Sequence, residues 1–263
     1  IAGAADRSGR PARTAAGGRA AAGKQPFTLF SFLISGFAFL YFLFGCILTA
    51  LIWLLLLIFP APKRMKQHWL RHVLRAFTGS LVYVMVNTRK DIQGYVSAIK
   101  GRPAIIIANH ASFIDILAML MFTPNVVIMT NRWVWNSPFF GRAVRYAGYL
   151  RTEDGVEVNM ERVREAMAQG LSVIIFPEGT RTQTGEIGDF KKTFAILSRE
   201  LNVPIVPVAI SGAYDALPRG THFPKPWKKI NVNFLKPILP ENHSYDSLKD
   251  IVQSKVSEQL NKK

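Results

Sequence analysis

The sequence predicts an α/β domain, with a mostly parallel sheet flanked by helices, preceded by an N-terminal membrane-embedded helix or hairpin. Short runs of Val, Ile and Leu alternate with helical patterns from about residue 79 onward, and this alternation favours a parallel sheet covered on both faces. The run 29–59 is apolar and carries no charge. It exceeds the ~20 residues that a membrane span requires.

The first segment, residues 1–26, is dominated by Ala, Gly and Arg. A segment with so few large apolar residues cannot bury a core, so we expect it to be disordered. The chain begins with Ile1 rather than Met, which we interpret as the result of processing, trimming or excision from a longer chain.

Residues 27–78 form the predicted membrane-associated region. Because the apolar run is longer than a span needs, we expect either one tilted helix or a break near Gly36 or Gly45 into a re-entrant pair. Both flanks are basic, which favours a cytoplasmic position for them. The segment 62–77 mixes aromatic and aliphatic residues with cations, so it is either an interfacial amphipathic helix or an ordinary surface helix. We expect a bacterial inner-membrane protein with its active site on the cytoplasmic face.

The charge balance indicates an anionic partner. The chain of 263 residues carries 33 Lys and Arg against 17 Asp and Glu, a net charge of +16. Nucleic acid, anionic lipid and phosphorylated or CoA-like substrates would all suit this charge. No nucleic-acid-binding module is recognisable, so we expect no nucleic-acid partner. Cys46 lies inside the apolar run, where a buried small side chain is favoured over a reactive thiol.

The domain predicted at 79–263 is divided by its periodicity into strands and helices. Strands are predicted at 81–88, 103–109, 125–130, 171–177, 203–210 and 229–238. Helices are predicted at 115–122, 156–170, 194–201 and 245–261. Gly170 is expected to cap the helix that it ends.

The stretch "IIIANHASFID" supplies the first pair of candidate catalytic residues. His110 follows a predicted buried strand, and Asp115 lies five positions later. Ser112 and Asp115 also resemble a helix-capping box, in which case Asp115 would serve only the start of the helix. In the chemical interpretation, Asp115 accepts a hydrogen bond from His110 and leaves the other ring nitrogen free to act as a base.

The stretch "VIIFPEGTRT" has the same position after a predicted strand. It supplies candidate oxyanion-binding residues at Glu178, Gly179, Thr180 and Arg181. An arginine fork and backbone N–H groups can bind an oxyanion there, and Glu178 could orient Arg181. Lys191 and Lys192 follow and could reach a phosphate, although a polar turn and a solvated basic face are the alternatives.

In combination, these motifs resemble those of the glycerolipid acyltransferase family, which includes the 1-acylglycerol-3-phosphate acyltransferases. The resemblance rests on Asn-His with Asp115, on "FPEGTR" at 176–181, on "SPFFGRAVRYAGYL" at 137–150 and on "NVPIVPVAISG" at 202–212. It covers about residues 80 to 240. It implies a membrane-bound O-acyltransferase of phospholipid biosynthesis.

The resemblance also implies substrates and roles. The acyl donor would be a thioester of coenzyme A or of acyl carrier protein, with no other cofactor and no metal. The acceptor would be a lyso-lipid, foremost 1-acyl-sn-glycerol-3-phosphate, and the product phosphatidic acid. His110 would take the proton of the acceptor hydroxyl, Asp115 would support the imidazolium, and the residues from Glu178 to Arg181 would bind the phosphate.

Two departures from the family pattern keep other acceptors open. An arginine is common about six residues after the glycine of the second block, but here Arg151 lies three residues after Gly148 and Asp154 takes the later position. Thr193 replaces the glycine that usually follows two lysines. A lyso-aminolipid is therefore an alternative acceptor. A non-catalytic basic membrane-binding protein and a lipid hydrolase are alternatives of other classes.

Overall fold

The computed structural model describes residues 29–84, 89–99, 102–137, 141–221, 224–225 and 228–262. The segment predicted to be disordered, 1–26, lies outside these residues. So do Pro138 of the second family block and the second half of the strand predicted at 81–88.

A seven-stranded sheet in the order β1-β7-β6-β2-β5-β3-β4 forms the centre of the fold. All neighbouring strands are parallel except β6 and β7, which confirms the prediction of a mostly parallel sheet. The strands are β1 (Arg89–Gly94), β2 (Ile105–Ala108), β3 (Val126–Thr130), β4 (Leu150–Arg151), β5 (Ser172–Ile175), β6 (Ile205–Ser211) and β7 (Lys229–Phe234).

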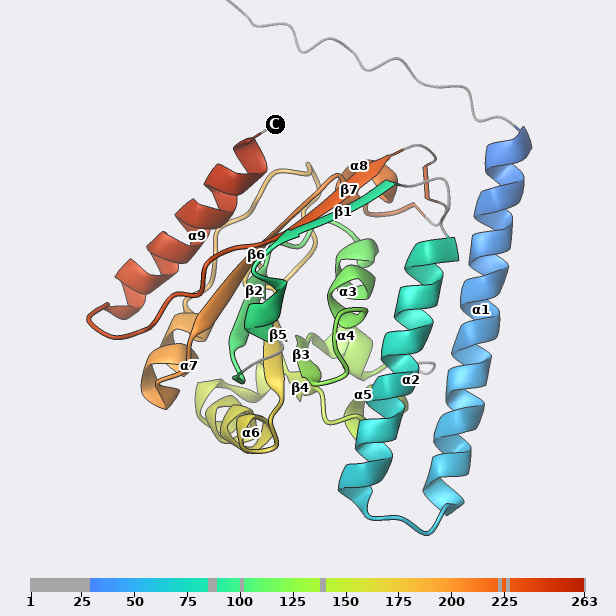
Figure 1. The fold of residues 1–263 in the computed structure, drawn as a ribbon, viewed down its shortest axis with the longest axis horizontal. Coiled ribbons are helices and arrows are strands. Elements are labelled where there is room, and N and C mark those ends of the chain that lie inside the picture. The colour runs from blue at the N-terminus through green and yellow to red at the C-terminus, as the bar shows by residue number, and fades with distance from the viewer. Residues whose placement is uncertain are drawn as a thin grey trace, which may run out of the picture.

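Helices cover both faces of this sheet, as Figure 1 shows. Helices α6, α7 and α9 lie on one face, and α3 and α4 lie on the other, with α2 and then α1 outside them. The helices are α1 (Leu29–Ile58), α2 (Lys63–Val84), α3 (Phe113–Leu120), α4 (Arg132–Trp135), α5 (Gly141–Tyr146), α6 (Val156–Ala168), α7 (Thr193–Leu201), α8 (Ala213–Ala216) and α9 (Tyr245–Asn261).

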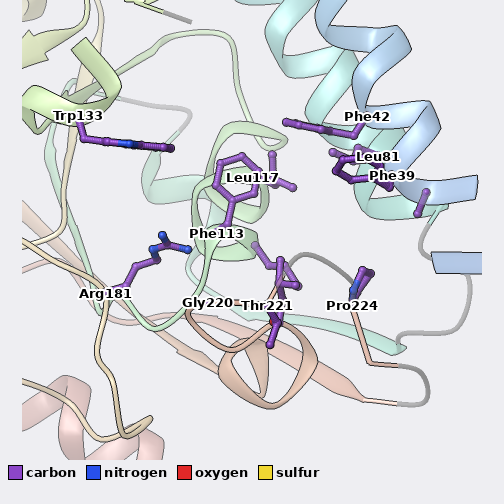
Figure 2. Close-up of a pocket in the computed structure, with 13 residues that line it drawn as sticks. Phe39, Phe42, Leu81, Phe113, Leu117, Trp133, Arg181, Gly220, Thr221 and Pro224 are labelled. Carbon is purple, nitrogen blue, oxygen red and sulfur yellow. The ribbon is translucent and has the colours of Figure 1, made fainter. Parts of the chain in front are cut away.

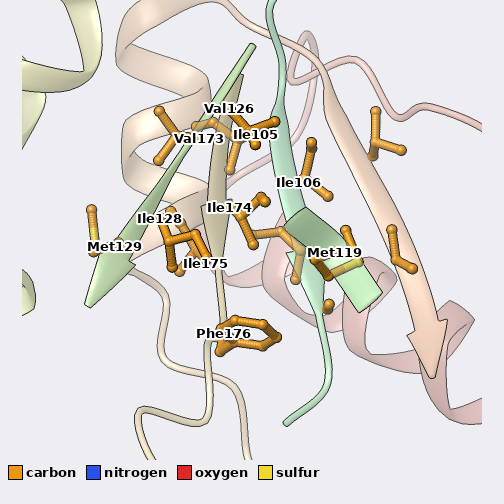
Figure 3. Close-up of a cluster of buried hydrophobic side chains, with 14 of the residues drawn as sticks. Ile105, Ile106, Met119, Val126, Ile128, Met129, Val173, Ile174, Ile175 and Phe176 are labelled. Atoms are coloured by element: carbon orange, nitrogen blue, oxygen red, sulfur yellow. The ribbon is translucent and has the colours of Figure 1, made fainter. Parts of the chain in front are cut away.

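The core lies around the central strands. Ile105 and Ile106 of β2 and Val173 and Ile174 of β5 are fully buried, and their side chains interdigitate with those of β3 (Figure 3). Strands buried on both faces require continuous aliphatic runs rather than alternation. This requirement explains why these strands were predictable. Gly170 has a φ of +76° and ends α6 as expected.

Helix α1 is continuous, so of the two alternatives the single helix is observed and no break occurs near Gly36 or Gly45. Gly45 instead lies against α2, where an added Cβ would sit 1.9 Å from the ring of Phe77. The glycine therefore permits close packing of two helices, a use that a single helical run does not reveal. The Tyr41 hydroxyl donates to Ser80 Oγ at 2.8 Å and further joins α1 to α2.

The strand predicted at 81–88 is also wrong in its first half. Leu81 and Val82 lie in the last turn of α2 and are buried with Leu117 of α3. The β-branched pattern is overridden because the helix continues to pack against α3. Strand β1 begins only at Arg89 and forms an edge of the sheet.

The two N-terminal helices differ in what they bury. Within the described part of the chain, only the helical stretch Phe32–Ile58 is long and apolar enough to cross a membrane. Most of its large side chains are exposed. Helix α2 packs Leu70 against the domain core, as an ordinary surface helix would. Contact between α2 and a membrane surface stays a prediction. Ser35 of α1 donates to the Pro224 carbonyl at 3.0 Å, which ties α1 to the domain.

Candidate active site

The two candidate loops meet at one edge of the sheet. β2 and β5 are parallel neighbours, so the loops that follow them emerge side by side at their carboxyl ends. The backbone N–H of Thr182 donates to the His110 carbonyl at 3.0 Å and joins the loops. The sequence predicted only that each motif follows a strand. The pairing of β2 with β5 in the sheet is what brings the two motifs together.

His110 and Asp115 form the expected pair. His110 Nδ1 lies 3.2 Å from Asp115 Oδ2. The histidine side chain is 12% exposed and that of Asp115 is fully buried. Phe176 stacks on the imidazole, with the ring centroids 4.3 Å apart. In the tautomer in which Nδ1 donates to Asp115, Nε2 keeps its lone pair and can accept a proton.

Asp115 also caps helix α3. Its Oδ2 accepts hydrogen bonds from the backbone N–H groups of Ala111 and Ser112, both at 2.7 Å. Ser112 Oγ accepts from the Ile114 N–H at 3.3 Å. The capping interpretation is therefore confirmed. The contact that the chemical interpretation requires is also present, since the same carboxylate oxygen serves the helix and contacts the histidine, and the catalytic role stays a prediction.

Asn109 fixes the strand end that carries His110. Its side-chain amide donates to the Ile210 carbonyl at 2.9 Å, and its Oδ1 accepts from the Ile210 N–H at 2.8 Å. The side chain is buried. Asn109 thus joins the end of β2 to β6, a role that the sequence did not reveal because the two residues are far apart in the chain.

Glu178 binds two backbone N–H groups. Its Oε1 accepts from His110 at 2.7 Å and its Oε2 from Gly188 at 2.9 Å. Burial raises the pKa of this carboxyl, although both hydrogen bonds oppose the shift. The prediction that Glu178 orients Arg181 is wrong, because its oxygens hold the His110 loop and the loop at Gly188.

Of the two candidate lysines, one reaches the site. The Lys191 amine lies 2.9 Å from the position that a Cβ on Gly179 would occupy. Gly179 has a φ of +74°, a conformation that glycine tolerates best. Lys192 instead pairs with Asp246 at 3.4 Å, so the structure places it away from the glycine loop.

Arg181 is joined by a second cation, Arg219. Arg219 Nη1 donates to the Arg181 carbonyl at 3.0 Å and contacts Thr180 Oγ1 at 3.4 Å. Burial and the charge of Arg219 lower the pKa of Arg181, yet a guanidinium remains charged. Neither arginine forms an ion pair with a carboxylate in the described part of the chain. Arg219 was missed because it lies in a cationic, Pro-rich loop without a motif.

An apolar cavity of about 370 Å³ adjoins this site. Figure 2 shows Arg181 at one end and Phe39, Phe42 and Leu81 of the N-terminal helices at the other, with Phe113 between them. The cavity follows the first residues of α3, directly after the His110 loop. It can hold an apolar chain whose polar end lies near Arg181.

The altered second block has its own ion pairs. Arg151 and Arg162 both contact the Asp154 carboxylate. Burial would raise the pKa of Asp154, but the hydrogen bonds from both arginines hold it below its usual value. Arg151 also lies 6.0 Å from the centroid of the Trp135 ring.

No group of three or more His, Cys, Asp or Glu side chains within the described residues is arranged to hold a metal ion.

Comparison with known proteins identifies the family. The family profile described as Acyltransferase matches residues 84–211. A 1-acyl-sn-glycerol-3-phosphate acyltransferase of Limnanthes alba is 30% identical over 214 residues, which cover 79% of this chain and 75% of the relative. The chain belongs to the glycerolipid acyltransferase family. The enzyme of the same name from Cocos nucifera is also 30% identical, over a region that covers 78% of this chain and 68% of the length of that enzyme.

The acyltransferase shares its fold with a solved structure. The crystal structure of the 1-acyl-sn-glycerophosphate acyltransferase PlsC from Thermotoga maritima superposes with a TM-score of 0.73. The match covers 88% of this chain and 96% of that one, at 21% identity. This similarity supports the fold.

Proposed function

We propose that this acyltransferase transfers an acyl chain to the free hydroxyl of 1-acyl-sn-glycerol-3-phosphate, which gives phosphatidic acid. One observation carries the proposal: the loop of the His110–Asp115 pair is joined to the loop of Arg181, which lines an apolar cavity and forms no ion pair within the described residues. The acceptor has the three matching parts, namely a hydroxyl, a phosphate and an acyl chain. The names of the relatives from Limnanthes alba and Cocos nucifera support the same acceptor.

In the proposed mechanism, His110 Nε2 takes the proton of the acceptor hydroxyl as its oxygen attacks the thioester carbonyl. Asp115, held by two backbone N–H groups, stabilises the imidazolium that forms. The new C–O bond forms as the C–S bond breaks. The imidazolium then returns its proton to the departing thiolate, so the enzyme ends in its starting state without a covalent intermediate.

The acceptor phosphate would bind between Arg181 and Arg219. Burial, and after it the charge of Arg219, lower the pKa of Arg181. Two close cations that form no ion pair with a carboxylate among the described residues favour an anion between them. Lys191, above Gly179, supplies a third charge. Gly179 and Thr180 would contribute backbone and hydroxyl groups. In this proposal Glu178 supports the site by holding the His110 loop rather than touching the phosphate, and Lys192 takes no part.

The acyl chain of the acceptor would enter the apolar cavity. Its far end is walled by Phe39 and Phe42 of α1, a helix whose outer side chains are largely exposed. We propose that α1 lies in a membrane, with the active site at the cytoplasmic surface, so that the chain passes directly between bilayer and cavity. The net charge of +16 suits an anionic donor, either acyl-CoA or acyl carrier protein.

A lyso-aminolipid remains the second candidate acceptor. The observation that favours it is Arg151, which is paired with Asp154 and so is less available to a phosphate than an unpaired arginine. The His110–Asp115 chemistry would be the same for either acceptor.

The deciding experiment supplies labelled acyl-CoA and acyl carrier protein with a panel of lyso-lipids to the purified enzyme in nanodiscs. We expect label in phosphatidic acid, and none with His110→Ala. Transfer only to a lyso-aminolipid would overturn the acceptor but keep the mechanism. Undiminished transfer by His110→Ala would overturn the mechanism.

A further inference from the structure

A second cavity, of about 440 Å³, lies where α2 begins. Its walls come from the first two turns of α2, from α5 and the segment after it, and from one side of α6, the lower part of the molecule in Figure 1. It shares no lining residue with the apolar cavity, with the His110–Asp115 pair or with the Glu178–Arg181 loop. The acyltransfer reaction therefore leaves it unexplained.

The charge in this cavity is strongly positive. Five cations line it against one carboxylate, Glu165: Lys63, Arg64, Arg71, Arg145 and Arg162. Arg162 is neutralised by Asp154, and Arg145 donates to the Trp135 carbonyl. Lys63 and Arg64 are exposed and form no ion pair within the described ranges.

Arg71 is the strongest indication of a ligand. Its side chain is only 7% exposed, and Nη1 donates to the Ala147 carbonyl at 3.2 Å. Its Nε is buried without a hydrogen-bond partner in the described part of the chain. A buried guanidinium that forms no ion pair with any described carboxylate is costly. A phosphate oxygen in the cavity would relieve this cost by accepting a charge-assisted hydrogen bond.

The helix itself adds donors at the same place. Lys63 and Arg64 are the first residues of the 22-residue helix α2. The N–H groups of Met65 and Lys66 donate to the Pro62 carbonyl, so the first-turn donors still open in the described part of the chain are those of Lys63 and Arg64. They lie at the positive end of the helix dipole, which favours an anion. Arg71 lies two turns further along the same helix, so both sets of donors lie at one cavity.

The surroundings indicate a lipid as the source of the anion. Helix α1 ends directly before α2, and its last turns expose Leu54, Leu55 and Ile58. A phosphate at the start of α2 would therefore lie beside an apolar helix surface that acyl chains could cover. We propose that this cavity binds the phosphate of an anionic membrane phospholipid, at a site separate from the reaction.

Native mass spectrometry of the detergent-purified enzyme tests this site. Phosphatidylglycerol and phosphatidylcholine of equal chain length are titrated separately, and bound lipid is counted. We expect phosphatidylglycerol to bind more tightly, and Arg64→Gln to weaken it on the order of ten-fold, the size of one charge-assisted hydrogen bond. Arg75→Gln is the matched control, because Arg75 is an exposed arginine of α2 outside the cavity.

Two further arms make the result decisive. Arg71→Lys keeps the charge but removes Nε, so it should also weaken the binding of phosphatidylglycerol. If this buried variant fails to fold, Lys63→Gln at the exposed rim replaces it. Inorganic phosphate tests the other source of the same chemistry. Binding of phosphate without preference for phosphatidylglycerol would overturn the lipid assignment. Equal lipid binding by the parent, Arg64→Gln and Arg75→Gln would overturn the site.

Discussion

The loop that carries His110 and the loops that carry Arg181 and Arg219 meet at one site, yet they are held differently. Around His110 most polar atoms are paired internally: Asn109 with Ile210, and Asp115 Oδ2 with two backbone N–H groups and the imidazole. Asp115 Oδ1 is the exception, because it is buried without a hydrogen-bond partner among the described residues. The arginines, in contrast, form no ion pair within the described residues.

This difference indicates that the two sides of the site have different functions. A base must be fixed before substrate arrives, since small displacements are costly in rate. An anion site instead needs cations whose hydrogen-bonding capacity is still open. Substitutions on the histidine side should therefore lower turnover, and substitutions on the arginine side should mainly weaken acceptor binding.

The largest effect is expected for His110→Ala. Loss of the base should lower kcat by at least about 10³-fold, measured by acyl transfer under saturating substrates. His243→Ala, in the loop before α9, is the control and should retain activity. A substantial kcat in His110→Ala would contradict the assignment of turnover to the histidine side of the site.

Asp115→Asn should lower kcat on the order of 10³-fold, because the amide cannot stabilise an imidazolium as a carboxylate does. Ser112→Ala separates capping from chemistry. It should cost about 1 kcal/mol of unfolding free energy with a much smaller loss of kcat. Equal losses of kcat in the two variants would show that Asp115 acts only as a cap.

Arg181→Ala should raise the KM for the phosphate acceptor by about ten-fold or more, with a smaller change in kcat. Arg219→Ala should raise it less, since one of its nitrogens already binds the Arg181 carbonyl. If both bind one phosphate, the double variant should depart from additivity. Additive effects on KM would assign the arginines to different ligands.

Lys191→Ala and Lys192→Ala form a matched pair. Lys191 lies over Gly179 and Lys192 pairs with Asp246, so we expect a several-fold rise in acceptor KM only in the first variant. Equal effects on KM in the two variants would contradict the placement of the phosphate near Gly179.

The smallest effect concerns Glu178 and pH. Burial raises the pKa of the folded carboxyl, so the folded state holds the proton more tightly than the unfolded state. Its contribution to stability is then present at low pH and is lost as pH rises through the folded pKa. The unfolding midpoint of the parent relative to that of Glu178→Gln should fall over this range. If the unfolding midpoint of the parent instead rose relative to that of Glu178→Gln as pH increased, the folded pKa of Glu178 would be lowered rather than raised.

Local sequence patterns made much of the fold predictable, together with the part of the candidate site that contains His110 and Asp115. Buried strands such as β2 are aliphatic throughout, and His110 and Asp115 are close in sequence because the first turn of α3 brings them together. Arg219 and Asn109 gain their roles from partners far along the chain. The same holds for Leu81, whose strand-like pattern was overridden by packing between helices.

The contact of α1 with the domain bears on attempts to obtain a soluble enzyme. Removal of α1 would take away Ala38, Phe39 and Phe42 from the wall of the apolar cavity and would free the Pro224 carbonyl from Ser35. The shortened protein would keep His110 and Asp115 but lose one side of the cavity that we propose holds the acyl chain. Poor turnover after such trimming would then reflect an opened active site rather than lost attachment to lipid.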